Sequence, residues 1–460
     1  MGSLTSALWS ASQALGVDQA AVDTTANNIA NENTPGYTRE IPVLTEAPPV
    51  LDGNISYGSG VELQQIQSVR DQILELRIAE ETQQQSSAQA QSSALQQVQA
   101  LFSSPTQGIG ADFTAFFDSI SQLSGDPTSI PDRQAVLTAA QNLSSDFNQT
   151  EGNLDSIQSG LNQTVSQTVS QINGLTQQIA QLNQQVGQMQ KLGQDPGVLQ
   201  DQETELIDQL SQLTNVSIIQ TENGETLTTG NGTPLVVGGQ SFALQTANGP
   251  TGMVDVASAQ GQDITSSIQG GSLGGTIQVR DQAIPALLTQ IDNLASQFAD
   301  SFNSAQAEGY DLNGNAGQAL FSVTAGPGAA STLSVAITDP SLIAASSDGT
   351  AGSNGNVANL LAVQTQALPS GADPLDTYSN LVAQTGNLAS QAQAEVSATT
   401  TSLNQLDDQR GAISGVDIDE ETTNLLNYQR AYEAAARVVS TVDALTQAVL
   451  QMGANAPSAP

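Results

Sequence analysis

The longest apolar pattern in the chain runs from Leu154 to Leu192, with an apolar residue at every third or fourth position. The intervening residues are mostly glutamine, serine, threonine and asparagine. This spacing places the apolar side chains on one face of a helix, which must bury that face against other helices. Similar segments run near 63–102, 134–147, 198–213, 283–307 and 376–408. We therefore predict an elongated multi-helix rod whose helices pass up and down its length.

The two ends of the chain carry the same heptad-like pattern. A helix is predicted to end near Asn31, and its apolar positions are Leu8, Leu15, Val22 and Ile29. At the other end, the three-four spacing is carried by Leu425, Tyr428, Tyr432, Ala435, Val439, Val442, Leu445 and Val449. Both terminal helices thus have an apolar stripe that a partner must bury.

Residues 216–275 differ in character from the helical segments. Short β-branched runs alternate there with Asn-Gly pairs, which are strong signals for turns between antiparallel strands. The stretch GGSLGG at 270–275 then returns the chain to helix, and we interpret it as a hinge. A second β-rich stretch at 320–337 predicts a β-hairpin on the rod. The predicted fold class is mainly α, with a small inserted antiparallel β domain.

Composition removes several classes of function. Nine basic residues against 45 acidic ones leave a formal charge of −36, so the chain lacks the basic surface that nucleic acid requires. It has no cysteine and no histidine, which removes thiolate and imidazole catalysis and the commonest zinc ligands. We find no apolar segment long enough to span a membrane and no cleavable secretory signal.

Two acidic stretches are candidates for a metal site or an acid–base site. YDLNGNAG at 310–317 alternates carboxylate and amide side chains as a calcium loop does, but its sixth and twelfth positions lack the required glycine and glutamate. We therefore expect a turn. DIDEE at 417–421 fits the acidic first turn of a helix, capped by Ser414 or Asp417. We predict no catalytic residues, no metal site, no cofactor and no enzyme activity.

The stretch TTANNIANENTPGYTRE at 24–40 crowds asparagines against a turn. Asparagine side chains compete with the helix backbone for hydrogen bonds, so local helix stability does not explain them. Proline followed by glycine suits a type II turn. The residues singled out in this motif are Asn27, Asn28, Asn31, Pro35, Gly36 and Tyr37.

This motif strongly resembles the N-terminal motif of the flagellar rod, hook and hook-associated protein family. The run SGVDIDEETTNLLNYQRAYEAAARVVSTVDAL at 414–445 is similar to the C-terminal signature of that family. Interior segments at 132–143, 208–218 and 270–321 resemble its hook-associated members. The resemblance implies a structural component of the bacterial flagellum at the hook–filament junction. It also implies that the terminal helices pair as a coiled coil and that the β domain faces outward.

The resemblance further implies partners and a location. Such a protein associates with itself in a ring or short helical zone through its terminal helices. Its neighbours are the hook protein and a second hook–filament junction protein, hook-associated protein 3. A flagellar export chaperone is expected to hold the C-terminal helix. The protein is expected to be extracellular, exported through the type III channel without a cleavable signal peptide and without membrane insertion.

We predict three domains from these patterns. They are a terminal coiled-coil core at 1–62 plus 411–460, a helical rod at 63–215 plus 276–410, and an outer β domain at 216–275. The three motif asparagines are hypothesised to bond to the C-terminal helix or between subunits and so to fix the register of assembly. The alternative function is a secreted coiled-coil stalk protein or adhesin that binds through its β domain.

Overall fold

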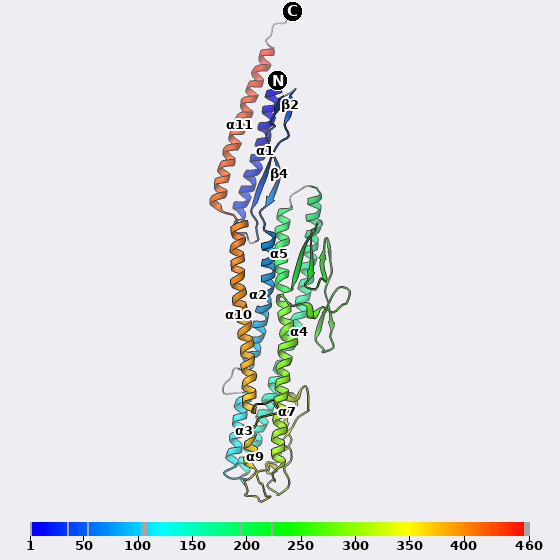
Figure 1. Cartoon of the computed structure of the whole chain (residues 1–460), viewed down its shortest axis with the longest axis vertical. Helices are drawn as coiled ribbons and strands as arrows, with labels where there is room; N and C mark the ends of the chain where they lie inside the picture. Colours follow the sequence, from blue (N-terminus) through cyan, green and yellow to red (C-terminus); the bar gives the residue numbers. More distant parts are fainter. Residues whose placement is uncertain are drawn as a thin grey trace, which may run out of the picture.

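The chain forms a long rod with both termini at the same end (Figure 1). The computed structural model describes residues 2–34, 36–52, 55–102, 108–192, 196–221 and 224–454. The predicted site residue Pro35 lies outside these residues. Along this described part of the chain, no helix is long and apolar enough to cross a membrane.

Long helices make up the rod, as the apolar spacing predicted. α10 packs along α2, α2 packs against α5 and α6, and α4 packs against α3 and α5. The rod helices are α2 (Gln72–Phe102), α3 (Ile109–Leu123), α4 (Ile130–Lys191), α5 (Gly197–Leu213), α6 (Gly271–Gln278), α7 (Ile284–Ala307), α9 (Val357–Ala362) and α10 (Pro374–Ser414). Short turns of other helix types lie at Thr265–Ser267 (η1), Val279–Ala283 (η2) and Pro340–Leu342 (η3).

The helix α4 is the longest element, with 62 residues, and it joins two segments that the sequence suggested as separate helices. The Ser129 hydroxyl accepts a hydrogen bond from the backbone N–H of Asp132 (3.3 Å). Pro131 lies in the first turn, where its missing N–H costs no hydrogen bond. The helix therefore has a well-defined start, and nothing in 148–153 interrupts it.

The predicted inserted β domain is present and packs on α4. Its main sheet has four antiparallel strands in the order β5-β6-β7-β8, and β9 pairs with β10 beside it. The strands are β5 (Val216–Thr221), β6 (Gly224–Thr229), β7 (Pro234–Val237), β8 (Gln240–Ser241), β9 (Gln245–Asn248) and β10 (Val254–Ala257). In Figure 1 this domain flanks α4 and α5 on one side of the rod.

The predicted β-hairpin near 320–337 is present but short. β11 (Phe321–Ser322) pairs with β12 (Ser334–Val335), and the one-turn helix α8 (Ala329–Thr332) lies between them. The Asp292 carboxylate on α7 accepts hydrogen bonds from the backbone N–H groups of Gly328 and Ala330, each at 2.9 Å. These bonds fix the hairpin on the rod.

The expectation of helix from residue 63 was wrong, because strands in 40–52 and 55–68 form two antiparallel pairs, one nested within the other as parts of one long hairpin. β1 (Glu40–Glu46) pairs with β4 (Val61–Ser68), and β2 (Val50–Asp52) pairs with β3 (Ile55–Tyr57). The Asp71 carboxylate accepts hydrogen bonds from the backbone N–H groups of Ile73 and Leu74, and so caps α2. This cap starts the helix at Gln72 and leaves the preceding residues as strand.

The division into three domains remains a prediction. Two of its predicted boundaries fall inside helices or strands of the structure. The predicted boundary at 62 lies inside β4, and the boundary at 411 lies inside α10. The boundary at 216 coincides with the start of β5. The strand pair β1–β4 therefore belongs with the terminal helices, because both of its strands pack against α1.

The GGSLGG stretch contains a close-packing site, and its role as a hinge stays a prediction. It begins the helix α6, which lies against α2. A Cβ atom added to Gly275 would lie 2.2 Å from the backbone oxygen of Ser87 on α2. Glycine at this position therefore lets two helix backbones approach more closely than a side chain would permit.

The rod has its own cores, whereas the terminal helices do not. One buried cluster, at the end of the rod far from the terminal helices, includes eight phenylalanines from α2, α3, α4, α7 and β11, namely Phe102, Phe113, Phe116, Phe117, Phe147, Phe298, Phe302 and Phe321. A second cluster joins α4 and α5 to the sheet. A third, small cluster comprises Leu74, Ile78 and Leu406. Over the described residues, none of these clusters includes a residue of the two terminal helices.

Replacing Gly275 with alanine tests the close approach of α6 and α2. The added methyl group collides with backbone atoms, so the free energy of unfolding should fall by about 1–3 kcal/mol. The control is Gly174→Ala on α4, where an added Cβ meets nothing within 4 Å. That variant should gain about 0.5–1 kcal/mol from helix propensity. Urea titration monitored by circular dichroism measures both, and equal effects would contradict the packing role.

Candidate assembly interface

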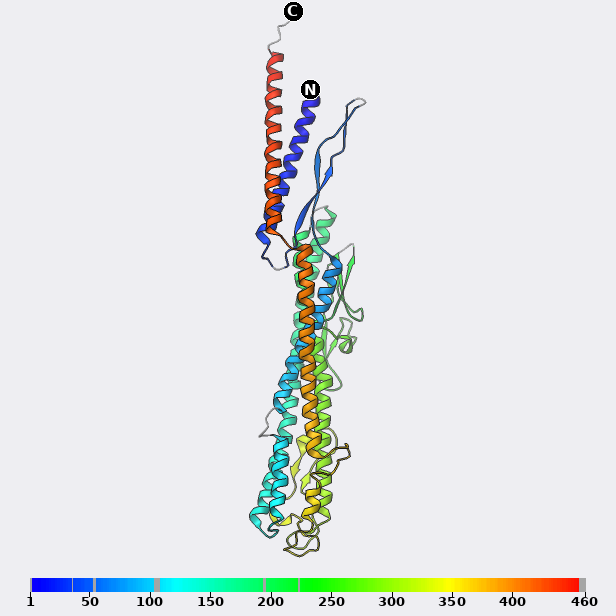
Figure 2. The ribbon, with the colours of Figure 1, turned by 60° about the vertical axis from the view of Figure 1, so that its left-hand side comes forward.

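The two terminal helices lie side by side beyond the end of the rod. α1 (Gly2–Asn31) packs against α11 (Ile418–Ala454), and also against β1 and β4. Figure 2 shows this terminal unit from a second direction, with the hairpin strands extending beside α1. We call α1, α11 and the strands β1–β4 the terminal unit. The pairing of N- and C-terminal helices that the sequence predicted is confirmed.

The DIDEE stretch begins α11, as the sequence predicted. The Asp417 carboxylate accepts hydrogen bonds from the backbone N–H groups of Asp419 (2.9 Å) and Glu420 (3.2 Å). Asp417 is therefore the cap, and the acidic residues that follow lie in the first turn, where the helix dipole favours them. Two of these acidic residues, Glu420 and Glu421, also have a second role.

Asn28 is the polar centre of the terminal unit. Its side chain is 1% exposed and its amide makes four hydrogen bonds. Nδ2 donates to the backbone oxygen of Glu40 (2.8 Å) and to the Glu421 carboxylate (3.2 Å). Oδ1 accepts from the Tyr37 hydroxyl (2.8 Å) and from the backbone N–H of Glu40 (3.0 Å). One amide thus connects α1, the turn, β1 and α11.

Arg39 reinforces the same junction through charge. Its guanidinium pairs with the Glu420 carboxylate (Nη2–Oε1, 2.6 Å) and with the buried Glu421 carboxylate (Nε–Oε1, 2.8 Å). The hydrogen bond to Glu420 raises the pKa of Arg39 above its ordinary value. The backbone N–H of Arg39 also donates to the carbonyl of Ser414 at the end of α10 (3.0 Å). These contacts hold the start of α11 to the N-terminal motif.

The remaining residues of the motif form the predicted turn. The backbone N–H of Tyr37 donates to the carbonyl of Thr34 (3.2 Å), and Gly36 has a φ of +77°, as a type II turn requires. Burial raises the pKa of Tyr37, whose hydroxyl serves as a donor to Asn28. Asn31 donates to the Asn27 side chain (2.7 Å) on the exposed side of α1.

The residues of the two predicted apolar stripes fall into a half-buried group and an exposed group. Some of their residues face the partner helix and are half-buried, and these are Leu15, Val22, Ile29, Leu425, Tyr428, Ala435 and Val439, with Val442 buried. Others are exposed, and these are Leu8, Tyr432, Leu445 and Val449. Trp9, Leu426, Val438 and Leu450 are further exposed apolar side chains of the two terminal helices. We call these eight exposed residues the exposed stripe.

Sequence reasoning missed the charged partners of the motif. Glu421 is 2% exposed and lies 393 positions from Asn28, so no local pattern connects the two residues. A signal did exist, because Arg39 is one of only nine basic residues and directly follows the turn. An isolated cation beside a conspicuous motif predicts an ion pair with a distant acidic residue.

Comparison with known proteins matches each part of this architecture. The family described as "Flagellar hook-associated protein FlgK helical domain" matches residues 95–321, which lie in the rod. The family "Flagella basal body rod protein" matches residues 8–38, and "Flagellar basal body rod FlgEFG protein C-terminal" matches residues 409–452. The flagellar hook-associated protein 1 of Bacillus subtilis (strain 168) is 30% identical, over 96% of this chain and 97% of the relative. The chain belongs to the flagellar hook-associated protein 1 family.

Other relatives and a solved structure agree with this assignment. Flagellar hook-associated protein 1 of Salmonella typhimurium is 26% identical over 95% of this chain and 98% of the relative. That of Escherichia coli (strain K12) is 24% identical over 98% of this chain and 100% of the relative. The structure of the flagellar hook junction protein FlgK from Burkholderia pseudomallei shares the fold, with a TM-score of 0.68 and 19% identity. It covers 74% of this chain and 100% of the Burkholderia chain.

Replacing Asn28 with alanine tests whether the amide holds the terminal unit together. Loss of its hydrogen bonds leaves buried groups of Glu40 and Glu421 without their amide partner, which should cost about 2 kcal/mol. The control is Asn27→Ala at the adjacent, exposed position, where we expect a change within about 0.5 kcal/mol. Urea titration followed by the fluorescence of Trp9, the sole tryptophan, monitors α1 directly. Equal midpoints for the two variants would contradict this role.

Proposed function

We propose that this member of the hook-associated protein 1 family is a structural component of the bacterial flagellum that forms the hook–filament junction. It polymerises through α1 and α11, in a ring or short helical zone between the hook protein and hook-associated protein 3. The observation that carries this proposal is the exposed stripe on two terminal helices that, within the described part of the chain, add no residue to the three buried apolar clusters.

The exposed stripe is the surface that assembly would bury. Leu445 is 49% exposed and Leu450 is 63% exposed, although both lie on a helix whose period matches a coiled coil. Fully burying one leucine or valine side chain contributes about 1.5–3 kcal/mol. Several such side chains on each subunit supply a driving force for polymerisation that a single chain leaves unused.

The motif asparagines supply a polar element within this apolar surface. Asn28 bonds to α11 within the chain, whereas Asn27 and Asn31 lie on the accessible side of α1. A groove bordered by Asn27, Asn31 and Tyr37 separates this side of α1 from α4 and α5. We infer that Asn28 fixes the register of α1 on α11, and that Asn27 and Asn31 bond to a neighbouring subunit.

The same surface suits the partner expected before assembly. An export chaperone on α11 would cover apolar side chains from Leu425 to Val449 until the chain leaves the cell. Membership of the family implies a location on the flagellum, and we propose that the assembled protein lies outside the cell. The absence of cysteine allows the chain to pass through an export channel unfolded without forming disulfides.

The alternative, an adhesin that binds through its β domain, is not favoured. Relatives named for the flagellar hook match nearly the whole chain, including the two terminal segments that an adhesin stalk would not require. Strands β6 to β10 pack on α4, and apolar side chains of β5, β6, β7 and β10 belong to a core shared with the rod. The β domain is therefore a supported part of the rod.

Introducing charge into the exposed stripe tests the assembly surface. The double variant Leu445→Glu, Val449→Glu places carboxylates where neighbours would bury apolar side chains, so association should weaken by about 100-fold or more. The matched control is Gln447→Glu on the opposite face of α11. Polymerisation of the purified proteins is measured by sedimentation, and motility by complementing cells that lack this protein.

The result expected for the double variant is a soluble chain with unchanged helix content, no polymer, and cells that keep their hooks but shed flagellin. The control variant should polymerise and restore motility. Normal filaments on cells that carry the double variant would contradict assembly through this surface.

A further inference from the structure

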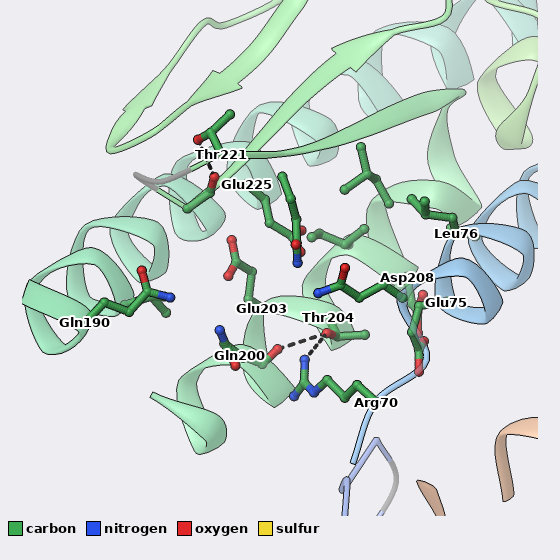
Figure 3. A pocket seen from close by; sticks show the side chains of 17 residues that line it. Arg70, Glu75, Leu76, Gln190, Gln200, Glu203, Thr204, Asp208, Thr221 and Glu225 are labelled. Carbon is green, nitrogen blue, oxygen red and sulfur yellow. Dashed lines mark hydrogen bonds between the residues drawn. The ribbon is translucent and has the colours of Figure 1, made fainter. Parts of the chain in front are cut away.

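A cavity lies where the terminal unit meets the rod, between α2, α5 and the sheet strands β5 and β6. Its volume is about 380 Å³. Figure 3 shows Glu203 pointing from α5 toward the sheet, and Glu225 pointing from β6 back toward α5. Arg70 and Thr204 lie at one side of the cavity, and Glu75 lies at another. We call this space the acidic cavity.

The acidic cavity carries more negative than positive charge. Four carboxylic acids line it, namely Glu75, Glu203, Asp208 and Glu225, and Arg70 is the one cation among its described lining residues. The Arg70 guanidinium is already engaged, because it pairs with Asp201 outside the cavity and donates to the Thr204 hydroxyl (3.1 Å). It therefore offsets the charge of the cavity acids only in part, and the Glu75 carboxylate has a second cation, Arg410, at 3.9 Å.

Glu203 is the residue whose environment most requires a partner. Its side chain is 3% exposed, and its Oε1 atom has no hydrogen-bond partner among the described residues. The Oε2 atom of Glu225, across the cavity, has none there either. An unpaired buried carboxylate costs several kcal/mol, so native proteins nearly always pair such groups.

The pKa values of these acids are raised, as expected for carboxyl groups whose charged form is costly to bury. Burial, followed by the nearby Glu225 carboxylate, raises the pKa of Glu203 to about 8, although Arg70 opposes the shift. Burial and Glu75 raise the pKa of Asp208 to about 7, with Arg410 of α10 opposing and Glu205 and Asp407 adding to the shift. Near neutral pH both acids thus retain protons that a bound cation would displace.

The shape and chemistry of the acidic cavity favour an organic cation over a metal ion. Among the described residues, no group of three or more acidic side chains is placed to hold a metal ion. Apolar side chains also line the cavity, and they include Leu76, Val186 and Ile218. Carboxylates at separate points and apolar lining side chains suit a short alkyl chain with charged nitrogen at its ends.

We propose that the acidic cavity binds a small organic cation with a primary ammonium or guanidinium group, which donates hydrogen bonds to Glu203 and Glu225. Its alkyl part lies against Leu76, Val186 and Ile218. The inference does not depend on assembly at the hook–filament junction. The site adjoins the Thr38–Asp201 and Arg70–Asp201 contacts, which join the segments flanking β1 and β4 to α5, so a bound cation would stiffen this connection.

Calorimetric titration of the full chain with putrescine and with agmatine tests the proposal. Saturable binding of at least one of the two is expected at a pH of about 8, where Glu203 loses its proton. The Glu203→Gln variant keeps the shape of the side chain without its charge and should bind at least about tenfold more weakly. The control, Glu80→Gln, changes an exposed acid of α2 outside the cavity and should alter binding less than about twofold.

Proton release separates this site from general attraction to an acidic protein. Near pH 7 Glu203 is protonated in the folded chain, so cation binding should release a proton, seen as a binding enthalpy that depends on the buffer. The raised pKa also means that stability falls as pH rises from the unfolded value of about 4.5 to about 8. Glu203→Gln should remove this fall in stability between pH 4.5 and 8. The same unfolding measurements show whether the variant folds.

Three results would overturn the proposal. They are the absence of saturable binding by both amines, equal binding by Glu203→Gln and the unchanged chain, and equal heats from magnesium chloride at matched ionic strength. The uncharged analogue butanediol should not bind in any of these experiments.

Discussion

The terminal unit carries more apolar surface than one chain can bury, and the architecture follows from that constraint. The rod is complete, with a phenylalanine-rich core at its distal end and a second core under the sheet. Among the described residues, α1 buries Ala11, Val17 and Ala21 and α11 buries Val442, whereas Leu445 and Leu450 of α11 stay exposed. In the function that we propose, neighbouring subunits complete the packing of the helix pair that this stable rod presents. Isolated helices gain most of their stability from such packing, so ordering of the termini and polymerisation are coupled.

Apolar contacts alone do not fix how the helices align, and the polar junction around Asn28 does. Its four hydrogen bonds, together with the pairing of Arg39 with Glu420 and Glu421, connect the end of α1 to the start of α11. A slip of one helix along the other would leave these buried groups unpaired, which costs more than the sliding of an apolar seam. From this junction, Thr38 and Arg70 reach Asp201 on α5. These two contacts fix the position of the terminal unit relative to α5 of the rod.

The sequence predicted the helices and the inserted sheet because three-four apolar spacing and Asn-Gly turns are local signals. It predicted helix where β4 forms, because the stretch Val61–Ser68 has apolar residues at both two- and three-residue spacing, and the Asp71 cap was not recognised. The Asn28–Glu421 hydrogen bond could not be predicted from local sequence patterns, because the two residues lie 393 positions apart and meet only in the folded chain. The division of one apolar stripe into a half-buried and an exposed face likewise depends on where β1 and β4 pack.

Hydrogen–deuterium exchange of the purified chain, before and after polymerisation, tests the coupling of assembly and terminal order most directly. Assembly should slow the exchange of backbone amides in α1 and α11 by at least about tenfold, whereas amides in the distal core around Phe298 should exchange at unchanged rates. Slow exchange of both terminal helices in the monomer, with no further protection in the polymer, would contradict the account.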